Sequence, residues 1–155
     1  ALAKVEFEEA MFQGADVSSF SSYLAITLFK LKAYEQIIEF NEFSNLSSNQ
    51  KIDWLRIKSS ACLEIENYLC AKESFITIGD LTGNAVDKLN GLAQLGLAEK
   101  QYGLADDYVG QALKLNPNQA ISWQIRGLIA KAQKNIPQAI EYMQQAFNLS
   151  PDDPL

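Results

Sequence analysis

The sequence predicts an all-α solenoid built from consecutive pairs of antiparallel helices. A period of thirty-four residues runs through the chain and is visible at several phases. The column of large residues is Tyr34, Tyr68, Tyr102 and Ile136. The column of small residues is Ala25, Ser59, Ala93 and Gly127. Asn116-Pro117 and Ser150-Pro151 also stand one period apart, each after an apolar helical stretch that a proline would end.

The period divides most of the chain into windows that are each long enough for two helices. These windows are 18–51, 52–85, 86–119 and 120–153, and with the last residues they form one array over 18–155. Residues 1–17 continue the register backwards, because Ala3, Phe7 and Ala10 stand where a second helix would place small, large and small side chains. We therefore expect 1–17 to be the remainder of a preceding repeat. The chain stops soon after the fourth window, so we expect a fragment of a longer solenoid; the alternative is a complete array whose exposed end helix pairs with another copy.

The residue types explain why each window should fold as a helical pair. Small side chains on facing helices allow a close approach, and larger ones such as Leu92 and Tyr102 fill the space around them. Pro137 fits the first turn of a second helix, where its missing N–H group costs little. One pair leaves an apolar face bare, so neighbouring pairs have to bury it.

This pattern resembles the tetratricopeptide repeat (TPR) family. The last window carries the resemblance on Trp123, Gly127, Ala139, Ala146 and Pro151. The third window carries it on Leu89, Leu92, Ala93, Tyr102, Ala105, Ala112 and Pro117. The first two windows keep fewer of these residues and have Asn49 and Gly83 where the proline would stand. The resemblance implies a right-handed superhelix that binds proteins.

Composition and charge exclude several classes of function. Thirteen basic against nineteen acidic residues give a net charge of -6, and the basic residues are scattered, which argues against nucleic acid and anionic membranes as partners. No apolar run is long enough for direct membrane insertion. The chain has no histidine, so catalytic triads and HExxH zinc sites are excluded. We expect the protein to have no enzymatic activity, no cofactor and no metal site. We interpret the neighbouring carboxylates of Asp106 and Asp107 as exposed charge.

Two cysteines give a weak indication of compartment. Cys62 and Cys70 are eight residues apart, which is neither a metal-ligand spacing nor a disulfide framework, so buried free thiols are expected. Free thiols favour the cytoplasm. A bacterial periplasmic lipoprotein whose targeting segment has been removed is the alternative.

The resemblance to TPR arrays also predicts a binding surface, because in such proteins the first helices of successive units line a concave groove. Mapped by phase, the groove residues are Ser22, Tyr23, Ile26, Phe29, Lys30, Arg56, Ile57, Ser60, Leu63, Asn90, Gln94, Leu97, Gln124, Leu128 and Lys131. Their mixed character suits a peptide or helix with anchors every three to four residues. The clamp with which some TPR proteins hold C-terminal carboxylates is not reconstructed, since only Arg56 and Asn90 have the required character.

The predicted function is a non-catalytic scaffold for protein–protein interaction. The alternatives are a chaperone for secreted or pilus subunits and a regulatory module of a larger enzyme. The last repeat predicts a homodimer, with Tyr142 and Phe147 as its self-association residues. In the third window, Gly91 and Gly96 leave one helix without side chains at two positions. This predicts that a partner segment or a neighbouring helix packs closely against it.

Overall fold

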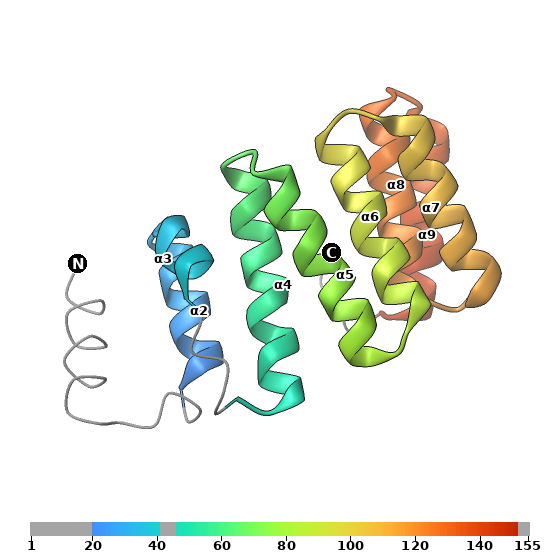
Figure 1. Ribbon diagram of the computed structural model, residues 1–155. Helices are drawn as coiled ribbons and strands as arrows, with labels where there is room; N and C mark the ends of the chain where they lie inside the picture. The colour runs from blue at the N-terminus through green and yellow to red at the C-terminus, as the bar shows by residue number, and fades with distance from the viewer. Residues whose placement is uncertain (1–19, 41–45, 152–155) are drawn as a thin grey trace, which may run out of the picture. The chain divides into compact units, whose positions relative to one another are not determined.

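The computed structural model describes residues 20–40 and 46–151 of the chain, and all regular structure within these ranges is α-helical (Figure 1). The predicted all-α fold of consecutive helix pairs is therefore confirmed. The chain divides into two compact units, Ala1–Leu81 and Thr82–Leu155, and each is described by itself. The segment 1–17, predicted to be the remainder of a preceding repeat, lies outside the described residues.

The first unit contains the pair α2 (Ser21–Lys30) and α3 (Tyr34–Glu39), followed by α4 (Ser48–Glu64) and α5 (Tyr68–Thr82). Its buried apolar cluster consists of Leu24, Ala25, Leu28, Ile37, Trp54 and Ala61. The Trp54 ring is fully buried and stacks on Phe40 with ring centroids 4.0 Å apart. Helix α4 begins before the predicted window boundary at 52, because Ser47 and Gln50 form a capping box that satisfies the first free N–H groups.

The second unit contains the pairs α6 (Ala85–Ala98) with α7 (Tyr102–Leu115) and α8 (Ala120–Ala132) with α9 (Ile136–Leu149), seen side by side in Figure 1. Its buried cluster consists of Ala93, Ala105, Val109, Leu113, Ile125 and Ile129. A Cβ atom at Gly96 would lie 3.2 Å from Ala105 Cβ, so α6 and α7 touch where one helix lacks a side chain. At Gly96, the close packing predicted for the third window is therefore made by a neighbouring helix, α7.

The turns inside the helix pairs repeat the sequence period in the backbone. One residue in each turn adopts a positive φ angle, and these residues stand thirty-four positions apart. They are Lys32 (56°), Glu66 (57°), Lys100 (60°) and Lys134 (63°). Around Lys134, the Lys134 N–H donates to Lys131 O at 3.0 Å and the next N–H donates to Ala130 O at 2.9 Å. This is the hydrogen-bonded ending that satisfies the last carbonyl groups of a helix. The same pairs of bonds recur at the other three turns.

The prediction of two free thiols is wrong, because Cys62 and Cys70 form a disulfide. Cys62 lies near the end of α4 and Cys70 near the start of α5. The turn between these helices, in which Asn67 N–H donates to Cys62 O at 2.8 Å, reverses the chain and brings the two side chains together. The inference of a reducing compartment therefore loses its basis.

Candidate functional site

The predicted groove face of α2 offers two large apolar side chains to solvent. Tyr23 is 70% exposed and Ile26 is 45% exposed, while Lys30 is exposed beside them. Phe29 is placed differently, because it packs against the buried cluster of the first unit, with its ring centroid 5.4 Å from that of Tyr34. Ser22 is half-buried. The accessible apolar part of this face is therefore Tyr23 and Ile26.

The corresponding face of α4 is mainly polar. Arg56 and Ser60 are exposed, and the Ser60 hydroxyl donates to Arg56 O at 3.1 Å. Ile57 and Leu63 are half-buried, and Ile57 packs against the buried cluster. On this helix the accessible groove residues are a cation and a hydroxyl.

In the second unit, α6 presents less of its predicted face than expected. Asn90 is buried, and its Oδ1 accepts a hydrogen bond from the Ser122 hydroxyl of α8 at 2.9 Å. Asn90 lies on α6, and its hydrogen bond with Ser122, thirty-two residues later, makes it a contact between α6 and α8. Leu97 packs against the buried cluster, and Gln94 is half-buried.

Of the two first helices in the second unit, α8 has the more open apolar face. Leu128 is 43% exposed, Lys131 is exposed, and Gln124 is half-buried. Ile121, which the sequence analysis did not select, is exposed on the same face three residues before Gln124. Extending the predicted groove positions on α8 by one helical turn toward its N-terminus would have included Ile121.

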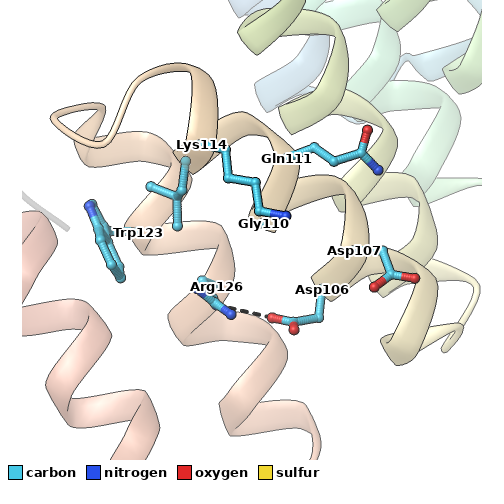
Figure 2. Close-up of a pocket in the computed structure, with 8 residues that line it drawn as sticks. Asp106, Asp107, Gly110, Gln111, Lys114, Trp123 and Arg126 are labelled. Carbon is cyan, nitrogen blue, oxygen red and sulfur yellow. Dashed lines mark hydrogen bonds and ion pairs between the residues drawn. The ribbon is translucent and has the colours of Figure 1, made fainter.

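A shallow pocket of about 550 Å³ lies on α7 and α8, outside the predicted groove. Figure 2 shows Asp106 and Arg126 pointing toward each other, with Trp123 and Asp107 at opposite sides of the view. Arg126 Nε donates to Asp106 Oδ1 at 3.1 Å. Lys114 and Asp107 are exposed, so the pocket carries both signs of charge.

The pocket is built by contacts that the sequence analysis did not anticipate. Trp123 Nε1 donates to Pro117 O at 2.8 Å, which fixes the indole beside the turn that precedes α8. The Arg126 guanidinium lies 5.1 Å from the centre of the Tyr142 ring, within the range of a cation–π contact. The interpretation of exposed charge holds for Asp107, whereas Asp106 is half-buried and paired with Arg126.

The predicted self-association residues occupy different environments. Tyr142 is half-buried, with its ring centroid 5.8 Å from that of Trp123 and with Arg126 over its face. Phe147 is exposed and lines a second, apolar pocket of about 510 Å³ on α8 and α9. The residues that line this pocket are Lys131, Ile136, Ala139, Ile140, Met143, Gln144 and Phe147.

Helix pairs that recur every thirty-four residues define a helical-repeat protein. Residues 120–153, which contain α8 and α9, match the family model described as tetratricopeptide repeat. Residues 120–153 are thus a tetratricopeptide repeat, as the sequence pattern predicts for the last window. No curated protein matches the chain. Repeats of this family generally mediate protein–protein interaction and are typically non-catalytic.

Within 20–40 and 46–151, no cluster of three or more His, Cys, Asp or Glu residues is arranged to hold a metal ion. In the same ranges, no helix combines the length and the apolarity that crossing a lipid bilayer requires.

Proposed function

We propose that the chain is a protein-interaction scaffold whose first-helix faces bind a peptide or a helix of a partner protein. The observation that carries the proposal is the pair of exposed apolar side chains on each of two first helices. Tyr23 and Ile26 lie one turn apart on α2, and Ile121 and Leu128 lie two turns apart on α8. Apolar side chains at these spacings are the anchors that helix-in-groove recognition requires.

Polar groups beside the anchors define the chemistry of the bound segment. Arg56 and Lys131 are exposed cations, while Ser60 and Gln124 offer hydrogen-bonding side chains. A segment with apolar residues every three to four positions and acidic or amide side chains between them would complement this set. In this proposal the windows 18–51, 52–85, 86–119 and 120–153 act as successive units of one array.

We also propose that the array has no catalysis of its own and does not bind nucleic acid. The chain lacks histidine, and the carboxylate of Asp106 is paired with Arg126 rather than with a nucleophile. The net charge of -6 disfavours a polyanionic partner.

A displayed library of random peptides tests the proposal. We expect selected peptides to carry apolar residues at helical spacing. Changing Ile26→Ser or Leu128→Ser should weaken their binding about five- to tenfold, since part of a large apolar contact is lost in each case. Leu69→Ser and Leu115→Ser are matched controls, because both leucines are highly exposed but lie on the second helices α5 and α7.

The controls decide the outcome. Binding that survives the groove substitutions and is lost with the controls would place the site on the second helices and contradict the proposal.

A chaperone for secreted or pilus subunits would bind unfolded apolar segments with little dependence on salt. A regulatory module of a larger enzyme would bind a segment of that enzyme.

We propose in addition that the chain forms a homodimer through its last repeat. The open apolar pocket on α8 and α9 supports this proposal, and Phe147 belongs to it. Tyr142 does not line the pocket, since its ring is held against Trp123 and Arg126.

A further inference from the structure

The pocket on α7 and α8 is formed around a glycine. Gly110 lines the cavity of about 550 Å³, and a Cβ atom added to it would meet nothing within 4 Å. The packing of the described residues therefore gives no reason for a glycine here, although glycine weakens a helix relative to alanine. The second helices α5 and α9 carry larger side chains at the same phase, Ile76 one period earlier and Gln144 one period later. The space over Gly110 is thus a feature of this repeat and not a requirement of the fold.

Both helices that form the pocket have neighbours on either side in the second unit. Helix α7 packs against α6 and α8, and α8 packs against α7 and α9. The pocket is therefore a surface that the packed helices leave open. Its lining contains none of the residues predicted for the first-helix groove.

Two side chains of α8 that line the pocket are held in place by contacts within the unit. Trp123 Nε1 donates to Pro117 O at 2.8 Å. Arg126 is held by its bond to Asp106 and by the ring of Tyr142. Trp123 and Arg126 are only half-buried, so part of each side chain is accessible from the pocket. Tryptophan and arginine are enriched among the residues that dominate binding energy at protein interfaces, and side chains that are already fixed lose little entropy on binding.

Polar side chains of α7 surround the space over Gly110. Asp107, Gln111 and Lys114 lie on one face of the helix, because they are separated by four and three residues. Figure 2 shows the three side chains around Gly110, and all three are exposed. Among the described residues, neither Asp107 nor Lys114 makes an ion pair. The pocket therefore has an unpaired negative group at one end and an unpaired positive group at the other.

The order of these charges favours a partner helix that runs antiparallel to α7. Helices favour acidic residues near their N-terminus and basic residues near their C-terminus. Placed antiparallel, such a helix brings its acidic residue to Lys114 and its basic residue to Asp107, which are about 10.5 Å apart along α7. A parallel helix would bring like charges together. Because Gly110 has no side chain, an apolar side chain of the partner can enter between the two charges and contact Trp123.

We propose that the pocket on α7 and α8 binds a helix of a further partner protein. The helix runs antiparallel to α7, with an acidic residue at Lys114, a basic residue at Asp107 and an apolar side chain over Gly110. This inference goes beyond the binding of a peptide or helix by the first-helix faces, because it gives the scaffold a second and separate surface. A scaffold with two such surfaces holds two partners at once.

Stapled helical peptides of about twelve residues, roughly 18 Å long, test the proposal. The first peptide carries a glutamate and, seven residues later, a lysine, with a leucine between them on the same face. The control peptide has the glutamate and the lysine exchanged. NMR follows the indole N–H of Trp123, with that of Trp54 as a reference because Trp54 is buried in the first unit. The first peptide should shift the Trp123 signal alone, and the exchanged peptide should bind about tenfold more weakly.

Variants of the chain test the individual contacts. Gly110→Leu fills the pocket and should weaken binding of the first peptide by about tenfold or more. Gly103→Leu is the matched control, because it also adds a side chain to open space on α7 but lies outside the pocket, so binding should persist. Asp107→Lys combined with Lys114→Asp exchanges the charges at two exposed positions and should reverse the preference between the peptides. Circular dichroism checks that each variant stays folded.

Four results would overturn the proposal. They are equal binding of the two peptides, binding that survives Gly110→Leu, a preference that the charge exchange does not reverse, and a Trp123 signal that neither peptide shifts. Self-association that is lost in Gly110→Leu, without peptide binding, would assign the pocket to a second copy and would also overturn it. Leu128→Ser should leave binding of the first peptide unchanged, which separates this surface from the first-helix faces; loss of binding in that variant would place the peptide on those faces instead.

Discussion

Adding one methyl group at Gly96 tests how closely α6 and α7 pack. The new Cβ would lie 3.2 Å from Ala105 Cβ and 3.3 Å from both the Cα and the N of Ala105. Two of these three atoms belong to the backbone, so the contact can be relieved only if the helices move apart. Gly110 on α7 provides the matched control, because a Cβ there would meet nothing within 4 Å.

The expected free energies follow from two opposing terms. Replacing glycine by alanine inside a helix stabilises it by about 1 kcal/mol. Overpacking of a close contact costs about 1–3 kcal/mol. Gly110→Ala should therefore stabilise the second unit by about 1 kcal/mol, while Gly96→Ala should destabilise it by about 0–2 kcal/mol. The difference between the two variants isolates the contact, because the propensity term is common to both.

Amide hydrogen exchange of α6 and α7, followed by mass spectrometry, is the suitable assay because it reports on the second unit alone. Protected amides should exchange about five- to 150-fold faster in Gly96→Ala than in Gly110→Ala. Equal slowing of exchange in both variants would refute the reasoning, since it would mean that α6 and α7 accept the methyl group without separating.

Three further predictions concern turns, the disulfide and pH. Lys134→Gly should stabilise the second unit by about 0.5–1 kcal/mol in urea unfolding, because glycine adopts the positive φ of 63° without strain. Reducing the bond between Cys62 and Cys70 should destabilise the first unit by at most about 2–3 kcal/mol, since the closed loop is short, and should leave exchange in α8 and α9 unchanged. Partial burial, and secondarily the Glu64 carboxylate, raise the pKa of Tyr34 above its ordinary value of 10.0. As the pH rises, the folded state therefore loses the phenol proton of Tyr34 later than the unfolded state does. The contribution of this group to the free energy of unfolding is complete below pH 10 and falls as the pH rises further. Tyr34→Phe should remove this part of the alkaline pH dependence, as measured by urea unfolding.

The helix pairs could be predicted from the sequence because they depend on a local period. Small residues recur where helices cross, and the same period returns in the backbone at the four turns from Lys32 to Lys134. The turns themselves were not predicted, since their residues are lysine and glutamate rather than glycine. Hydrogen bonds from the turn to the end of the preceding helix compensate for the positive φ angles of these residues.

The candidate sites were harder to predict, because phase fixes a position on a helix but not what faces it. Tyr142 and Phe147 were grouped by their place in the last repeat, yet five residues correspond to about 140° around a helix, so they face different neighbours. Asn90 was mapped to the groove, but its contact with Ser122 depends on how α6 and α8 pack. Tertiary contacts of this kind leave no local pattern in the sequence.

Methyl NMR of the isoleucine- and leucine-labelled chain, with and without the tightest peptide from the displayed library, tests the central claim most directly. The account predicts that the resonances of Ile26, Ile121 and Leu128 shift on binding, while those of Leu69 and Leu115 stay in place. Shifts confined to Leu69 and Leu115 would contradict it, because they would show that partners bind the second helices instead of the first.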